Sequence, residues 1–187
     1  MDSKLQIISG MFRGRKLHLP GGARPTQNRA RIALFNMLGE IVGAPANLTV
    51  WDAFAGSGEF GIEYLSRVVT ANVIFTDNAA QSIKTVNANI APLNVGARAT
   101  VVMADAMTRI DQFAKKSDLI FVDPPYEFAE TGARFVRRAA ASARAGTILV
   151  WEQDADKFMA PDAESWEILR DKTYGRARFL ILRRRAQ

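Results

Sequence analysis

The stretch Trp51-Asp52-Ala53-Phe54-Ala55-Gly56-Ser57-Gly58-Glu59-Phe60-Gly61 decides the fold. An apolar run enters a glycine-rich turn, and a helical pattern begins directly after it. Glycine allows a tight turn and a close approach of the backbone to a ligand, and a helix N-terminus presents free N–H groups. Gly56, Gly58 and Gly61 match G-x-G-x-x-G, the fingerprint of a dinucleotide-binding βαβ unit. The stretch therefore predicts a nucleotide-type cofactor at the end of a parallel strand.

Strand-like and helical patterns alternate along the rest of the chain. We expect strands at 49–55, 73–77, 99–105, 118–123 and 146–152, separated by helices at 60–67, 79–91, 106–115 and 130–144. Parallel strands need crossover connections of this length, so a Rossmann-like α/β fold follows. Two further strands, 165–174 and 177–184, are separated by a short turn and would add one antiparallel strand. The expected sheet has seven strands and is mostly parallel.

An extension precedes this alternation. Residues 5–19 are expected to form a β-hairpin around a turn from Gly10 to Gly14, and residues 27–40 show helical spacing. We therefore divide the chain into an N-terminal hairpin and helix extension, 1–45, and a catalytic domain, 46–187.

Aspartates follow four of the expected strands. Asp52, Asp77, Asp105 and Asp123 each stand near the end of a strand. Ligands of open α/β sheets bind at the carboxyl ends of the strands, so the four side chains are expected to converge there. For a methyltransferase cofactor, Asp52 can hold the ammonium group, Asp77 the ribose hydroxyls and Asp105 the adenine amino group. Each aspartate alone could instead be a helix N-cap.

The sequence Asp123-Pro124-Pro125-Tyr126 ends an apolar strand and predicts the catalytic loop. Two prolines fix the backbone and have no N–H, so the carbonyls of the loop can face a ligand. The Asp123 carboxylate and the Pro124 carbonyl can accept N–H bonds from an amino group on a planar base, and Tyr126 can stack on that base. The loop predicts transfer of a methyl group to a base amine, in which alignment supplies much of the acceleration.

Composition limits the alternatives. The chain has 187 residues, no cysteine and one histidine, which excludes a disulfide framework, a Cys-based zinc site and thiol catalysis. We expect no bound metal, no membrane span and a cytoplasmic protein. Residues 1–40 carry a net charge of +5 and residues 170–187 a net charge of +6, whereas residues 41–169 carry −5. Basic ends of this kind attract nucleic-acid phosphates.

The motifs together resemble a family, the bacterial methyltransferases that modify N2 of guanine in 16S ribosomal RNA of the small subunit. The resemblance rests on Arg13-Gly14-Arg15-Lys16-Leu17, Arg24-Pro25-Thr26, the region 52–67 and Asp123-Pro124-Pro125-Tyr126. It implies S-adenosylmethionine as cofactor, S-adenosylhomocysteine as product and an RNA partner in the small subunit or an assembly intermediate. We expect a monomer.

The resemblance and the motifs assign the site residues. The cofactor-binding residues are Asp52, Phe54, Ala55, Gly56, Ser57, Gly58, Asp77, Asn78, Asp105 and Ala106. The catalytic residues are Asp123, Pro124, Pro125 and Tyr126. The RNA-binding residues are Arg13, Arg15, Lys16, Arg24, Thr26, Arg29 and Arg31.

Three other functions stay open at this point. The catalytic loop also suits methylation of N6 of adenine in DNA. The glycine fingerprint with Asp77 also suits a nicotinamide-dependent oxidoreductase. A non-catalytic RNA-binding protein on a methyltransferase scaffold is the alternative from another class.

Overall fold

The computed structural model describes residues 5–19, 28–43, 46–125, 127 and 129–186. Seven strands form one sheet in the order β3-β2-β1-β4-β5-β7-β6. The five parallel strands are β1 (Thr49–Asp52), β2 (Asn72–Asp77), β3 (Ala99–Met103), β4 (Leu119–Val122) and β5 (Ile148–Asp154). β7 (Ala177–Arg184) runs antiparallel to both β5 and β6 (Trp166–Tyr174). The predicted seven-stranded, mostly parallel sheet with one antiparallel strand is confirmed.

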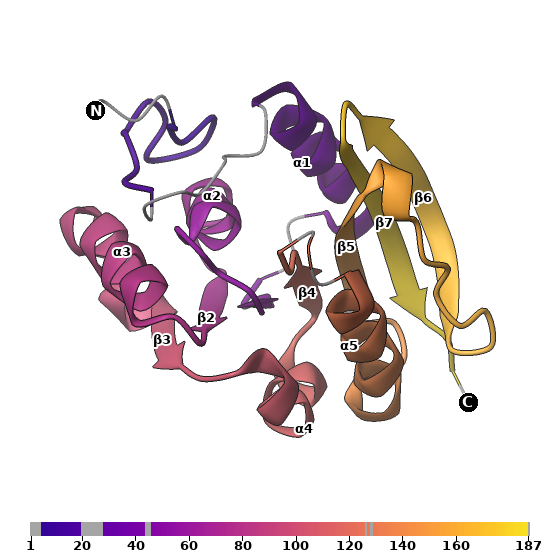
Figure 1. Ribbon diagram of the computed structural model, residues 1–187. Helices are drawn as coiled ribbons and strands as arrows, with labels where there is room; N and C mark the ends of the chain where they lie inside the picture. Colours follow the sequence, from indigo (N-terminus) through magenta and orange to yellow (C-terminus); the bar gives the residue numbers. More distant parts are fainter. Residues whose placement is uncertain (1–4, 20–27, 44–45, 126, 128, 187) are drawn as a thin grey trace.

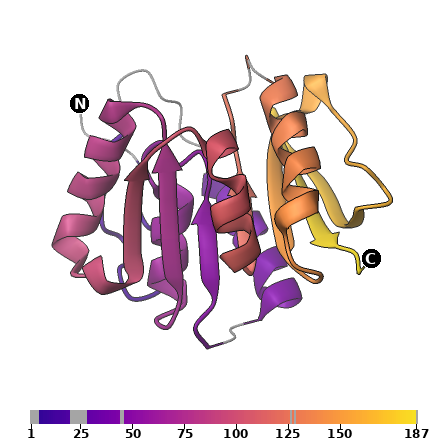
Figure 2. The same ribbon diagram turned by 90° about the horizontal axis from the view of Figure 1, so that it is seen from below.

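Helices cover both faces of the sheet (Figures 1 and 2). α1 (Asn28–Val42), α2 (Glu59–Arg67) and α3 (Ala80–Ile90) lie on one face, and α4 (Ile110–Phe113) and α5 (Ala129–Ser142) lie on the other. Short 3-10 turns occur at 91–93, 96–98, 106–108, 114–116 and 155–157. The helix expected over 106–115 is thus a four-residue helix between two 3-10 turns. Asp105 caps the first of these turns by accepting the N–H of Met107.

Two hydrophobic clusters hold the layers together, one on each face of the sheet. The α1–α3 side contains Val50, Phe75 and Phe121, and the α4–α5 side contains Trp51, Ile120 and Trp151. Neighbouring residues of one strand point to opposite faces, so a strand covered on both sides is apolar throughout. β4, for example, is buried at all four positions.

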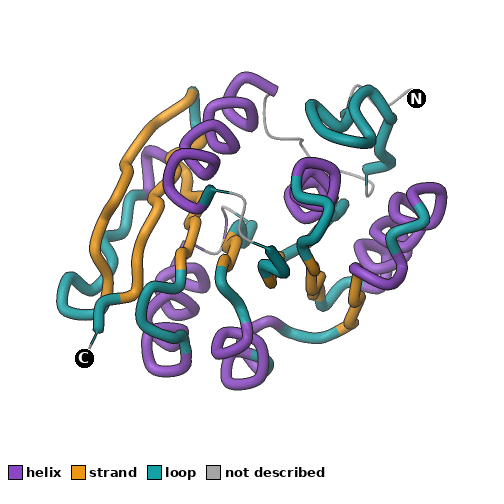
Figure 3. The backbone as a smooth tube through the Cα atoms, turned by 180° about the vertical axis from the view of Figure 1, so that it is seen from behind, coloured by secondary structure: helices purple, strands orange, loops and turns teal. Residues whose placement is uncertain are grey.

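The N-terminal segment 5–19 packs against α2 and α3 (Figures 1 and 3). The expected hairpin is present only in reduced form: one bridge joins Gln6 and Lys16, without two regular strands. The physical reason is competition for backbone donors, since the N–H groups of Ile8 and Ser9 bond to the carboxylate of Glu63 on α2 at 2.7 and 3.0 Å. The apolar side chains of the segment belong to the same cluster as the sheet. The division at 45/46 therefore remains a prediction about function.

Candidate active site

The glycine-rich turn connects β1 to α2, as predicted. Gly56 and Gly58 have φ of +53° and +78°, values that favour glycine. A Cβ at Gly56 would meet nothing within 4 Å, so the backbone there borders open space. Gly61 serves a different purpose, because a Cβ there would lie 2.3 Å from the Phe75 ring. It lets α2 pack closely on β2, which is the third role of glycine in this fingerprint.

Asp77, at the end of β2, orders this turn. Its two carboxylate oxygens accept the N–H groups of Gly56 at 2.9 Å and of Ala79 at 2.8 Å. Each carboxylate oxygen can accept a second bond, and the side chain is half-buried. The group can therefore hold the turn and still contact a ligand.

Asp52 lies beneath the turn, 1% exposed, and accepts the N–H of Gly61 at 3.1 Å. Burial raises the pKa of Asp52 to about 7, and the charges of Asp77 and Glu59 act in the same direction. A positively charged ligand group above the turn would favour the ionised form of this carboxyl.

Asp123 follows β4, one strand away from the glycine turn. Burial raises the pKa of Asp123 well above its ordinary value, and the charge of Glu152 is the next cause. Val122 pairs with Trp151 in the sheet, so Asp123 and Glu152 stand level at the ends of neighbouring strands. Glu152 is 3% exposed, and sequence analysis did not single it out. The signal that could have found it is an acid directly after the apolar run 148–151.

The proline loop is held from the α5 side. Pro124 is buried and Pro125 is exposed. A Cβ at Gly132 of α5 would lie 2.6 Å from Trp151 Nε1 and 3.1 Å from Pro124 Cγ. Only glycine lets the helix approach the loop this closely. Sequence analysis did not single out Gly132 either. Tyr126 lies outside the described residues.

The remaining predicted cofactor residues lie along the same edge of the sheet. Phe54 is half-buried, Ala55 and Ser57 are buried in the turn, and Asn78 is exposed after β2. Asp105 is exposed and acts as the cap described above, while Ala106 beside it is buried. The strand order thus brings Asp105, Asp77, Asp52 and Asp123 to one edge.

The predicted RNA-binding residues separate into three groups. Arg13, Arg15, Lys16 and Arg29 are exposed. Arg24 and Thr26 lie outside the described residues. Arg31 is 3% exposed, so its predicted contact with RNA phosphates is corrected.

Arg31 lies inside the protein because acids of α2 surround it. It forms ion pairs with Glu59 and Glu63 and donates to the carbonyl of Gln6 at 3.2 Å. Its role is to join α1, α2 and the N-terminal segment. The sequence could not reveal this role, since the partner carboxylates of Glu59 and Glu63 lie on α2, which follows α1 and β1 in the chain.

The basic C-terminal hairpin is largely neutralised by acids. Ion pairs join Arg170 to Glu40, Arg176 to Asp154, Arg178 to Asp171 and Arg183 to Glu167. Arg184 is buried and donates to the carbonyl of Ala140 at 2.6 Å.

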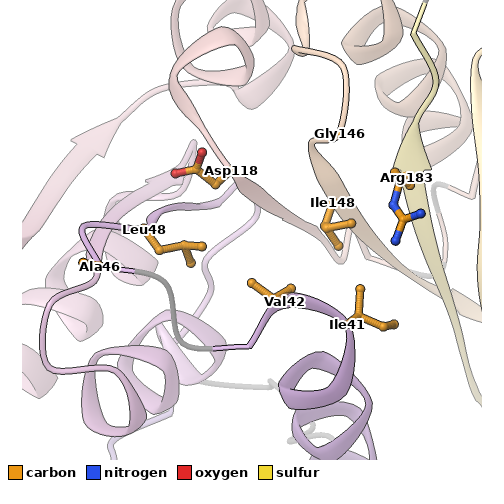
Figure 4. A pocket seen from close by; sticks show the side chains of 8 residues that line it. All are labelled: Ile41, Val42, Ala46, Leu48, Asp118, Gly146, Ile148 and Arg183. Atoms are coloured by element: carbon orange, nitrogen blue, oxygen red, sulfur yellow. The ribbon is translucent and has the colours of Figure 1, made fainter.

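A cavity of about 320 Å³ lies at the opposite edge of the sheet, where β1, β4 and β5 begin (Figure 4). Leu48, Asp118 and Ile148 line it together with the end of α1. It is far from the convergent aspartates, so we place the candidate active site by the aspartates instead. Within the described ranges, no group of three or more metal-ligating side chains is found and no helix is long and apolar enough to cross a membrane.

The sheet order, the glycine turn and the acids at the strand ends define a Rossmann-like, class I methyltransferase. A sequence model of the family described as "Conserved hypothetical protein 95" matches residues 5–183. The ribosomal RNA small subunit methyltransferase D of Escherichia coli K12 is 31% identical over 190 residues, which cover 100% of this chain and 93% of that protein. The chain belongs to this family of methyltransferases, as the resemblance of its motifs predicted.

A second relative and a solved structure are also methyltransferases by name. The protein of the same name from Haemophilus influenzae is 30% identical, over 92% of this chain and 90% of that protein. The structure of a putative methyltransferase yhhF from Escherichia coli superposes with a TM-score of 0.81 at 30% identity, covering 97% of this chain and 98% of that chain.

Proposed function

We propose that the protein transfers a methyl group from S-adenosylmethionine to the exocyclic N2 amine of a guanine in 16S ribosomal RNA of the small subunit or of an assembly intermediate. The observation that carries this proposal is the position of Asp123 and Pro124, one strand from the Gly56–Gly58 turn. The names of the relatives in Escherichia coli and Haemophilus influenzae support a ribosomal RNA substrate.

The residues at the turn fit the cofactor. Open space beside Gly56, the carboxylate of Asp77 and the exposed carboxyl of Asp105 suit a nucleoside with hydroxyl and amino groups. Asp52 suits the ammonium of its amino-acid part by charge. When bound, S-adenosylmethionine supplies an electrophilic methyl group on a positively charged sulfur and becomes S-adenosylhomocysteine.

Asp123 and Pro124 would prepare the acceptor nitrogen. The carboxylate and the carbonyl each accept one N–H bond, which draws the amine towards tetrahedral geometry and frees its lone pair. The raised pKa of Asp123 makes its carboxylate a better proton acceptor near neutral pH. We assign Tyr126 the stacking position against the base. A stacked or paired base would first have to be turned out of its helix.

The extension 1–45 would hold the RNA and the domain 46–187 would carry the chemistry. We propose that Arg13, Arg15, Lys16 and Arg29, with Arg24 and Thr26, contact the RNA backbone. A ribosomal substrate places the reaction in the cytoplasm, and its large surface lets the protein act as a monomer.

The test uses methyl-labelled S-adenosylmethionine with undermethylated small ribosomal subunits, followed by digestion and identification of the labelled nucleoside. Deproteinised RNA and genomic DNA are run in parallel. We expect label as N2-methylguanosine, lost with Asp123→Ala and retained with Asp111→Ala, which removes an exposed aspartate of α4. Label as N6-methyladenine in DNA would overturn the substrate. RNA binding with no label in any sample would favour the non-catalytic alternative.

A further inference from the structure

One buried side chain contacts both the N-terminal segment and the glycine turn. Asn89 stands near the end of α3 and is 3% exposed. Its Oδ1 accepts the N–H of His18 at 2.8 Å, and its Nδ2 donates to the carbonyl of His18 at 3.0 Å. The same Nδ2 donates to the carbonyl of Ser57 at 2.9 Å. An amide has two N–H donors, and here both are directed to backbone carbonyls from different parts of the chain.

The segment that Asn89 holds carries three of the cations assigned to RNA. Arg13, Arg15 and Lys16 stand within five residues of His18 and are exposed. Arg15 also donates to the carbonyl of Pro92, in the 3-10 turn after α3, at 2.9 Å. The segment is therefore fixed to the end of α3 at two points.

The turn that Asn89 holds borders the cofactor site. Ser57 lies between Gly56 and Gly58, the two glycines with positive φ. Asp77 fixes the turn from one side through the N–H of Gly56, and Asn89 fixes it from the other through the carbonyl of Ser57. A shift of the His18 or Ser57 backbone changes the bond that the Asn89 amide can make to the other, because burial shields the amide from solvent that could replace a lost bond.

We propose that Asn89 is a positioning residue that couples RNA binding by segment 5–19 to cofactor binding at the Gly56–Gly58 turn. RNA that orders the segment places the Asn89 amide correctly for the turn, and cofactor that orders the turn places it correctly for the segment. The coupling is reciprocal: each ligand strengthens the binding of the other by the same factor. This inference rests on the proposed function, since it takes ribosomal RNA as the ligand of the segment.

The experiment measures the Kd of S-adenosylhomocysteine for the full chain, alone and with saturating undermethylated small subunits. The ratio of the two Kd values is the coupling factor, and we expect about fivefold or more for the unaltered protein. Asn89→Asp keeps the shape and the acceptor for the His18 N–H but has no N–H for either carbonyl. We expect its coupling factor to fall to about one.

Asn87→Asp is the matched control. Asn87 is an exposed residue of the same helix, so its replacement makes the same change of charge without touching either carbonyl. We expect this variant to keep the coupling factor of the unaltered protein. A purely structural role for Asn89 would lower the melting temperature and both separate affinities while leaving the ratio unchanged, and that result would overturn the proposal.

A second measurement needs no variant. Hydrogen exchange of the peptide covering residues 5–19 is followed with and without S-adenosylhomocysteine, in the absence of RNA. Slower exchange on adding the ligand supports the coupling, and unchanged exchange refutes it. The proposed function fails separately, through the absence of methyl transfer to small subunits, so methylation of guanine with a coupling factor of one would reject only this inference.

Discussion

The aspartates at the edge of the sheet differ in what surrounds them, and this difference suits different roles. Asp77 and Asp105 accept backbone N–H bonds near the surface, so their carboxylates have hydrogen-bond support. Burial instead raises the pKa of both Asp52 and Asp123, and neighbouring acids add to the shift. Residues with strongly perturbed pKa values that share one site are candidates for function. If Asp52 binds a cationic group of the ligand, its ionised form is expected to be unfavourable when the ligand is absent.

Asp52 gives a prediction for stability against pH. Its pKa in the folded protein is about 7 against 3.8 ordinarily, so the folded state binds this proton more tightly than the unfolded chain. The stabilisation is complete below the ordinary pKa and is lost as pH rises through the folded pKa. Asp52→Asn removes this loss. The free energy of unfolding of the variant, relative to that of the unaltered protein, should therefore be about 2 kcal/mol higher at pH 8 than at pH 5. Urea unfolding at both pH values measures the difference.

The control for this prediction is Asp156→Asn, which makes the same replacement at an exposed position. We expect its difference from the unaltered protein to be the same at both pH values. If Asp52→Asn behaved in that way too, burial would not be what holds the Asp52 carboxyl neutral.

At the scale of elements, the N-terminal segment shows how a docked segment differs from a free hairpin. Four of its backbone N–H groups bond to Glu63 and Ser66 of α2, including the N–H of Met11 to the Ser66 carbonyl at 2.8 Å. Glu63 is fully buried and also binds Arg31 and Arg67. Arg31, which sequence analysis assigned to RNA, therefore helps to hold segment 5–19, and this segment carries the exposed cations Arg13, Arg15 and Lys16.

Two glycines of this segment test the docking. Gly10 and Gly14 have almost the same φ, +84° and +82°, so alanine at either is strained by about 1–2 kcal/mol. Their surroundings differ, because a Cβ at Gly10 would lie 2.0 Å from the Ser66 carbonyl oxygen, whereas at Gly14 nothing lies within 4 Å. We expect Gly10→Ala to lower the free energy of unfolding by at least about 2 kcal/mol more than Gly14→Ala. Equal losses in urea unfolding would show that the segment does not depend on this contact with α2.

The same elements show what the sequence could predict. The strands of the sheet were predicted within a few residues of their ends, because apolar runs bounded by turns and long crossovers leave one arrangement. The aspartates were found because each follows such a run. The docking of the N-terminal segment on Glu63, the burial of Arg31 and the contact of Gly132 with Pro124 were not predictable, since each depends on a partner that is distant in the sequence. Glu152 is an intermediate case. Its place directly after an apolar run can be read from the sequence, but its position level with Asp123 depends on how β4 pairs with β5.

For the whole molecule, charge must be counted after pairing. Both ends of the chain are basic in sequence, and this predicted attraction to nucleic acid at both. In the folded protein, four arginines of the C-terminal hairpin have carboxylate partners, whereas Arg13 and Arg29 are exposed and form no ion pair with any described residue. An ion pair leaves little net charge to attract a phosphate, so the N-terminal end should dominate RNA binding.

Salt dependence measures this asymmetry directly. Each phosphate contact contributes about −0.7 to −0.9 to the slope of log K against log salt concentration, because bound counterions are released. We expect Arg13→Ala/Arg15→Ala to reduce the slope for small-subunit RNA by about 1.5. The matched double variant Arg178→Ala/Arg183→Ala removes the same charge from β7, where Asp171 and Glu167 pair with these arginines, and should change the slope by less than about half as much. Because both variants lose two positive charges, a general effect of net charge would alter both slopes equally. Equal changes would mean that RNA responds to total charge, and an unchanged slope in the N-terminal variant would remove Arg13 and Arg15 from the RNA contact.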